Sequence, residues 1–126
     1  MRAKKIDKSI YGVGMKIAIP YDLKERLVPL DNALYIGIFD TDSSKLDEKE
    51  SLGYGSKEAT MQYIIDLGAD AVLVKKGFLC PGSYAMSKGK IRYIIVNSKT
   101  LKDAIKELPS AEIRDELNFE IYKETE

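Results

Sequence analysis

The feature that most constrains the fold is a run of four consecutive apolar residues, 71–74, set between two segments of helical pattern. A strand in which every residue is apolar is typically buried on both faces, as in a parallel sheet covered by helices. Before this run, Met61, Ile64, Ile65 and Gly68 recur at the spacing of one helix face. The sequence therefore predicts an α/β domain whose later strands are joined by right-handed helical crossovers.

The other apolar runs complete the predicted order of elements, which is βββαβαβα. Further strands are predicted at 15–20, 34–39, 45–50 and 91–96, and further helices at 81–88 and 101–108. The helix boundaries are Ser56 and Gly68 for the first helix, Pro81 and Gly89 for the second, and Thr100 or Ser98 and Pro109 for the third. In the tail, Ile113, Leu117 and Ile121 fit a helical stripe, while residues 118–122 fit an edge strand equally, and we favour the helix.

Length and charge indicate one domain with two appended ends. We expect a basic N-terminal extension at 1–14, the domain at 15–109 and an acidic C-terminal extension at 110–126. Lys and Arg number 20, as do Asp and Glu, which argues against nucleic acid as a partner. No apolar stretch suits a membrane span, and the one cysteine cannot form an internal disulfide. The basic N-terminal segment lacks the apolar run of a secretory signal, so we expect a reducing cytoplasm. The many Lys, Glu and Ile residues predict a heat-loving source.

Several segments together resemble the dinitrogenase iron-molybdenum cofactor biosynthesis family of nitrogenase accessory factor-like proteins. The similar segments are MKIAIP at 15–20, IFDTD at 38–42, the glycine-rich helix start at 53–56, LGADAV at 67–72 and PGSY at 81–84. The resemblance covers residues 15–108. It implies a ribonuclease H-like motif with a five-stranded mixed sheet flanked by helices, and a small protein that carries iron-molybdenum cofactor or a related iron-sulfur precursor.

The sequence departs from that family at two loops. Where many relatives have His-Phe-Gly between the first two strands, this chain has Pro29, Leu30 and Asp31, and where they have Gly-Gly after the fourth strand it has Gly77 and Phe78. The family's histidine therefore has no counterpart here.

Cys80 is the candidate metal ligand. It precedes Pro81 and so falls at the predicted N-cap of a helix, where the free N–H groups and the helix dipole favour a thiolate. A thiolate at this position is able to ligate iron. The alternative is that Cys80 is an ordinary small core residue.

The candidate cofactor-binding residues lie at the predicted carboxyl edge of the sheet, where open α/β sheets bind their ligands. Lys75, Lys76 and Gly77 follow a buried strand, and Gly55 and Ser56 open the first helix on the same edge. Two lysines and helix N–H groups suit an anion such as phosphate, carboxylate or a negatively charged cluster. The alternative is that both lysines face water.

The catalytic alternatives are weaker than binding. The sequence contains no histidine, the commonest general base, so Cys80 has no partner base of that kind. The first strand has no acid at its centre for two-metal nuclease chemistry. We therefore expect a protein that is not an enzyme and that binds an anionic metal-sulfur cofactor or another small anion. The alternative is a ligand-free interaction module with a protein partner or in a homo-oligomer.

Overall fold

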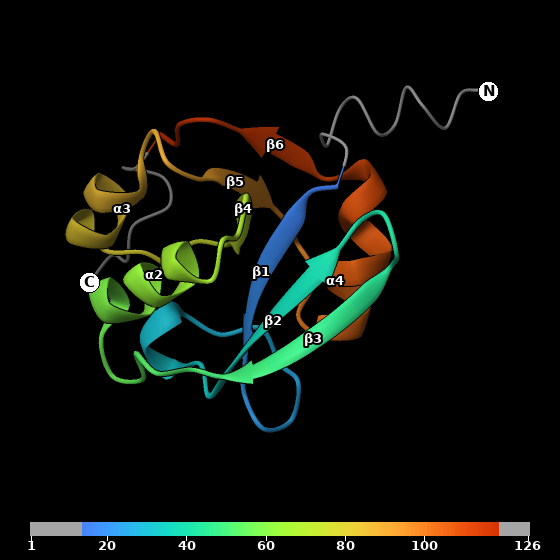
Figure 1. The fold of residues 1–126 in the computed structure, drawn as a ribbon, viewed down its shortest axis with the longest axis horizontal. Coiled ribbons are helices and arrows are strands. Elements are labelled where there is room, and N and C mark those ends of the chain that lie inside the picture. Colours follow the sequence, from blue (N-terminus) through green and yellow to red (C-terminus); the bar gives the residue numbers. More distant parts are fainter. Residues whose placement is uncertain (1–13, 119–126) are drawn as a thin grey trace.

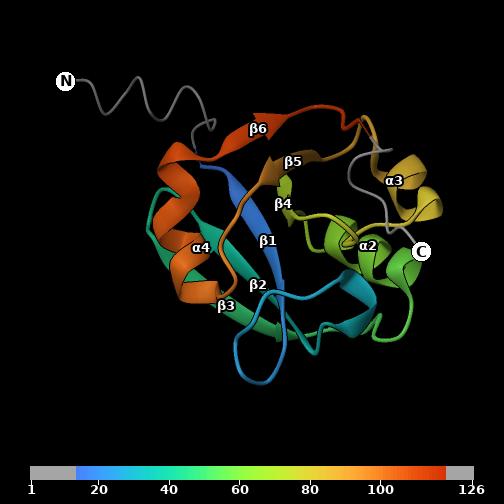
Figure 2. The same ribbon diagram turned by 180° about the vertical axis from the view of Figure 1, so that it is seen from behind.

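A six-stranded sheet with helices on both faces forms the centre of the computed structural model, which describes residues 14–118 (Figures 1 and 2). The elements are β1 (Lys16–Tyr21), η1 (Leu30–Asn32), β2 (Tyr35–Asp40), β3 (Lys45–Glu50), α2 (Lys57–Asp66), β4 (Ala71–Val74), α3 (Pro81–Ser87), β5 (Arg92–Ile95), α4 (Leu101–Glu107), η2 (Leu108–Ser110) and β6 (Glu112–Arg114). The strand order is β3-β2-β1-β4-β5-β6. The strands β1, β4 and β5 run parallel, whereas β2, β3 and β6 each pair antiparallel with their neighbour.

Local hydrogen bonds explain where the helices begin. The hydroxyl of Ser56 accepts the N–H of Ala59 at 3.0 Å at the start of α2. The hydroxyl of Thr100 caps α4 in the same way. Each such cap satisfies an N–H group that the first helical turn leaves unpaired. The predicted helix starts at Ser56, Pro81 and Thr100 are confirmed.

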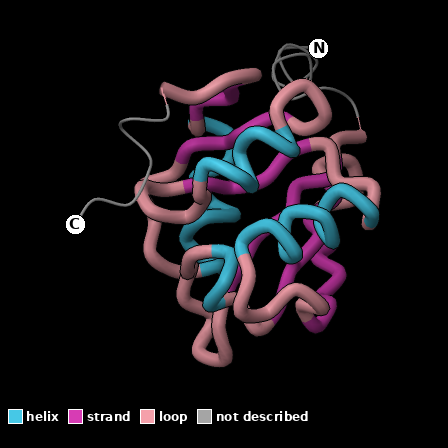
Figure 3. Tube along the Cα trace, turned by 90° about the vertical axis from the view of Figure 1, so that its left-hand side faces the viewer, coloured by secondary structure: helices cyan, strands magenta, loops and turns pink. Residues whose placement is uncertain are grey.

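The core consists of two apolar layers, one on each face of the sheet. Alternation along β1 separates them, because Ile17 and Ile19 face α4 while Ala18 faces the other side. The second layer lies under α2, α3 and η1 and includes Met61 and Ile64 of α2. Figure 3 views the molecule from the side of α2 and α3, with the strands behind them. The run 71–74 is fully buried, as its composition predicted.

The prediction of five strands is wrong, because Glu112–Arg114 forms the sixth strand at the edge beside β5. A helix had been expected from the spacing of apolar residues in the tail. Pairing with the free edge of β5 satisfies the backbone groups of this segment and overrides that weak helical pattern. Residues 119–126 lie outside the described residues, as do 1–13, so what was predicted for these two ends stays a prediction. The ribonuclease H-like assignment also stays a prediction.

The tail segment after β6 returns to α3. The side chain of Leu117 is 7% exposed and belongs to the core layer under α3. The hydroxyl of Tyr84 accepts the N–H of Leu117 at 3.0 Å. The acidic residues before it pair with cations of the domain, Asp115 with Arg92 and Glu116 with Lys88. Within 14–118, no helix combines the length and apolar character that a membrane crossing requires.

Candidate functional site

The carboxyl ends of the parallel strands β1, β4 and β5 lie at one edge of the sheet, which we call the carboxyl edge. Three loops leave it, at 22–34, 75–80 and 96–100, and the segment 51–56 that opens α2 joins them. Backbone hydrogen bonds tie the first loop to the others, because the N–H of Leu30 donates to Phe78 and that of Leu27 to Lys99. The predicted ligand-binding residues all lie on these segments.

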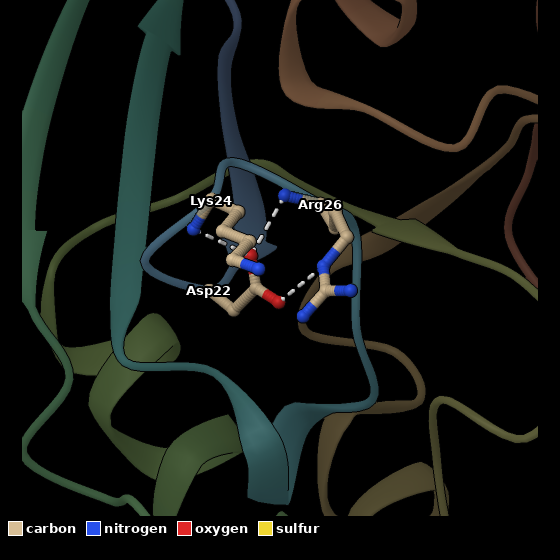
Figure 4. Close-up of polar contacts among 3 residues, drawn as sticks. All are labelled: Asp22, Lys24 and Arg26. Carbon is tan, nitrogen blue, oxygen red and sulfur yellow. Dashed lines mark hydrogen bonds and ion pairs between the residues drawn. The ribbon is translucent and has the colours of Figure 1, made fainter.

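The first part of loop 22–34 is a turn built around Asp22 (Figure 4). Its carboxylate accepts the backbone N–H groups of Lys24 at 3.0 Å and Arg26 at 2.9 Å, and the Nε of Arg26 at 2.8 Å. Burial by itself would raise the pKa of Asp22. The N–H groups and the Arg26 guanidinium have the larger opposite effect, so the pKa lies below its usual value. The turn also reaches α4, because Glu25 O accepts the N–H of Leu101 at 2.9 Å. Asp22 therefore has a structural role in this turn.

The second part of the loop contains Asp31, whose carboxylate has a buried oxygen without a hydrogen-bond partner. Its Oδ1 is buried and has no hydrogen-bond partner, the only side-chain nitrogen or oxygen of residues 14–118 in that condition. Its backbone carbonyl accepts the N–H of Gly55 at 2.9 Å, and η1 packs on α2. An unpaired buried polar atom costs about 1–3 kcal/mol. Such an atom needs a reason, and one reason is a ligand that supplies the missing partner.

Asp31→Asn is expected to stabilise the protein without ligand. At neutral pH the substitution replaces a buried charged oxygen by a neutral amide, and we expect the free energy of unfolding to rise by about 1 kcal/mol. Denaturant unfolding at pH 7 measures the change. A loss of stability in Asp31→Asn at pH 7 would show that the carboxylate is needed by the fold itself.

Cys80 is the N-cap of α3, as predicted, and is partly exposed. Its sulfur accepts the N–H of Ser83 at 3.4 Å, while the Ser83 hydroxyl accepts the N–H of Cys80 at 2.9 Å. This reciprocal pair is a capping box with a thiol in place of a hydroxyl. The thiol thus accepts one hydrogen bond from the helix start, and the residue as a whole is only partly buried.

Lys75 is directed to the α4 side of the carboxyl edge. Its Nζ donates to the carbonyl of Ser98 at 2.7 Å, and its charge acts on Glu107 at the end of α4. The Glu107 carboxylate accepts the N–H groups of Asn97 and Ser98 at 3.0–3.1 Å and also the Ser98 hydroxyl. Burial would raise the pKa of Glu107, but these donors and Lys75 outweigh it and lower the pKa. This is an anion-binding arrangement that the chain's own carboxylate fills.

A second internal carboxylate lies at the start of α3. A Cβ at Gly82 would overlap the Glu58 carboxylate, so this side chain of α2 lies directly against the first turn of α3. A negative charge is favourable at that end of a helix. The anion-binding property predicted for the α3 start is therefore met, at least in part, by Glu58.

The structure brings only some of the predicted residues together. Gly55 is hydrogen-bonded to Asp31. Cys80 lies two residues after Phe78, which is hydrogen-bonded to Leu30 of the same loop as Asp31. Lys75 instead lies on the other side, where it donates to Ser98 and is near Glu107. The other predicted residues are accounted for locally: the Ser56 hydroxyl caps α2, Gly77 has a φ of 86° in the turn after β4, and Lys76 is exposed. Whether any of them binds a ligand stays a prediction.

Sequence reasoning missed Asp31 and Glu107 as site residues. A signal for Asp31 was present, because it stands in the segment where relatives have His-Phe-Gly. The sequence contained no signal for Glu107. A helical pattern shows that Glu107 ends a helix, but it does not show that its carboxylate binds the loop after β5. Among residues 14–118, no group of three or more Cys, Asp or Glu side chains is arranged to hold a metal ion.

No protein-family model and no curated protein matches the sequence. Solved structures do match. One is a Thermotoga protein of the DUF35 family with a provisional NifB assignment, at 18% identity and a TM-score of 0.62, covering 79% of this chain and 91% of that one. A provisional dinitrogenase from Methanocaldococcus jannaschii matches at 16% identity and a TM-score of 0.63, covering 83% and 99%. The apo form of the orange protein from Desulfovibrio gigas matches at 16% and 0.63, covering 81% and 95%.

The chain shares their fold. The likeness covers 79–83% of this chain and 91–99% of each matched chain. At these identities the comparison concerns the fold alone, and the names of the matched proteins bear on this chain only as a proposal.

Proposed function

We propose that this protein is a small carrier that holds a metal-containing cargo at the carboxyl edge, on the side of α2 and α3. The observation that carries the proposal is the buried, unpaired Oδ1 of Asp31 beside the segment that opens α2. Two features support it. The matched structures include a protein in its apo form and two with provisional nitrogenase-related assignments. In addition, Cys80 and Asp31 lie on loops joined by the hydrogen bond from Leu30 to Phe78.

A resident iron-sulfur cluster does not fit these residues. Such clusters normally take several cysteine ligands, whereas this chain has one cysteine and no histidine. The described residues also lack a three-ligand group. A preassembled metal-sulfur species brings its own sulfides and requires fewer protein ligands, so Cys80 and Asp31 suit transient holding of a cargo rather than a permanent cofactor. Iron-molybdenum cofactor or an iron-sulfur precursor is the cargo class that we propose.

The proposal assigns binding and no catalytic step to the protein. Cys80 offers a thiolate to the metal, the oxygen of Asp31 offers a hard donor, and Gly55 and Gly77 keep the neighbouring turns free of side chains. Lys76, which is exposed, is left to offset negative charge on the cargo. A cytoplasmic location remains part of the same proposal.

A second function is favoured by a specific observation. Two features that were expected to bind an anion already face a carboxylate of the chain, because the charge of Lys75 acts on Glu107 and the start of α3 lies against Glu58. A protein whose anion-binding features are satisfied internally needs no anionic ligand, which favours a ligand-free interaction module of the same fold.

Cys80→Ser is expected to abolish cargo binding without destabilising the fold. Serine is a better N-cap than cysteine, so the bond from Ser83 N–H persists and the free energy of unfolding should change by less than about 0.5 kcal/mol. The measurement is iron and acid-labile sulfide analysis, with visible absorption, after oxygen-free incubation with an iron-sulfur donor. The parent should take up iron and show sulfide-to-iron absorption bands, and Cys80→Ser should not.

Ser110→Cys is a matched control, because it provides an exposed thiol after α4, at the opposite end of that helix from the loop 96–100. In the Cys80→Ser background it should not restore uptake. A parent protein that stays colourless and free of iron would contradict the carrier proposal and favour the interaction module. Equal uptake by parent and Cys80→Ser removes Cys80 from the site.

A further inference from the structure

Large apolar side chains are exposed at one end of the molecule. Within residues 14–118 four of them are exposed, and we call them the apolar rim: Leu52 at 78%, Leu23 at 71%, Tyr54 at 61% and Leu34 at 39%. All lie close in sequence to the end of β1, the start of β2 or the end of β3. The N–H of Leu34 donates to Tyr21, and the N–H of Ser51 donates to Leu34, so these strand ends are side by side (Figures 1 and 2).

The arrangement of the rim is more informative than the exposure of any one residue. Single exposed apolar side chains are ordinary, whereas a group gathered in one place marks an interaction surface. The rest of the described surface exposes no large apolar side chain. The rim is also not a consequence of strand pattern, because all four residues lie outside the strands, where polar residues are usual.

The charges beside the rim alternate in sign. Lys24 and Glu25 directly follow Leu23, and Lys49 and Glu50 precede Leu52. A rim of one sign would repel a second copy and select an oppositely charged partner, but alternating charges do neither. Lys49 pairs with Asp47 of its own chain at 3.2 Å. Charges of both signs beside the rim therefore leave two copies free to approach without the repulsion that a single sign would cause.

We propose that the apolar rim is the interface of a symmetric dimer of this chain. Among residues 14–118 the rim is the one group of large exposed apolar side chains, so apolar contact made by this part of the chain joins rim to rim, which closes as a dimer and does not propagate. Four side chains fall short of the roughly 800 Å² per partner of a standard interface, so the dissociation constant should lie between about 1 µM and 1 mM.

The dimer would also change access to the Asp31 site. Tyr54 precedes Gly55, whose N–H is bound by the Asp31 carbonyl, so a second copy on the rim would lie next to the loops of the candidate site. The dimer itself needs no cargo, and its test is therefore independent of the proposed function.

Sedimentation velocity of the full chain, from about 10 µM to 1 mM, tests the proposal. We expect the mass to rise from one chain of 14.1 kDa toward two with increasing concentration. In the variant Leu52→Ser/Tyr54→Ser the dissociation constant should rise at least tenfold, because burying one large apolar side chain contributes more than the roughly 1.4 kcal/mol that corresponds to tenfold. Leu52→Met keeps an apolar side chain of similar volume and should dimerise like the parent.

Three results would overturn the dimer. The first is a parent chain that remains monomeric to the highest concentration. In that case the rim would be a binding surface for a different protein. The second is undiminished association of the double serine variant, which places the interface elsewhere. The third is dissociation of the dimer in about 1 M salt, because salt screens charge pairs but does not weaken apolar contact. Far-UV circular dichroism of each variant controls for folding.

Discussion

Gly53→Ala is expected to cost about 3 kcal/mol or more in the free energy of unfolding. Gly53 lies against the backbone of α2, and a Cβ there would overlap the main chain of Ala59 and Thr60. Backbone cannot move aside as a flexible side chain does, so the helix or the loop has to shift, and overpacking of this kind costs 1–3 kcal/mol or more. Denaturant unfolding measures the change, and the midpoint should fall without a change in slope.

The matched control for Gly53 is Gly68→Ala. Gly68 has a φ of 83°, but no atom lies within 4 Å of its missing Cβ. Its substitution therefore introduces backbone strain alone, of about 1–2 kcal/mol. Equal losses in the two variants would show that close approach of Gly53 to α2 is not important.

Gly53 also matters for the candidate site. The Thr60 hydroxyl, which is fully buried, donates to the Gly53 carbonyl at 2.9 Å and so fixes the segment 51–56 on α2. That segment presents the Gly55 N–H to Asp31. A shift of Gly53 should therefore disturb the Asp31 site even in protein that remains folded.

Glu107→Ala is expected to destabilise the protein by about 2 kcal/mol at pH 7. The substitution leaves the N–H groups of Asn97 and Ser98 without their acceptor and Lys75 without its neighbouring charge. Hydrogen bonds to a charged group contribute about 1.5–3 kcal/mol, and partial exposure of the site reduces their sum. Glu107→Gln keeps one acceptor oxygen and should lose about half as much.

This contribution depends on pH in a defined direction. The folded pKa of Glu107 is lowered below its ordinary value of 4.5, so the unfolded chain takes up a proton at a higher pH than the folded one. The stabilisation is complete above the ordinary value and is lost as the pH falls through the folded pKa. The stability difference between parent and Glu107→Gln should therefore shrink below about pH 4.5 in denaturant unfolding.

Glu112→Gln is the control for Glu107. Glu112 makes an exposed ion pair with Arg114 at 3.1 Å, and such pairs contribute only about 0–1 kcal/mol. A loss at Glu112 as large as that at Glu107, or a Glu107 effect that persists undiminished at pH 3, would contradict the proposed arrangement around Asn97 and Ser98.

The sequence by itself determined the order and the boundaries of most elements. Period-two and period-3.6 apolar patterns follow directly from strand and helix geometry, and caps such as Ser56 and Thr100 act within four residues, so short-range information is sufficient for them. For the same reason the Cys80 N-cap was predictable. The full burial of the run 71–74 was also predictable, because a strand apolar at every position has no polar face to expose.

Only the tertiary structure decided the sixth strand, the environment of the candidate site and the apolar rim. The segment 112–114 became a strand because the edge of β5 was free, which its own residues cannot show. Lys75 donates to Ser98, 23 positions away in the chain, and the Asp31 carbonyl accepts the N–H of Gly55. Such contacts depend on which strands lie side by side, and a local pattern contains no information about partners that distant in the chain.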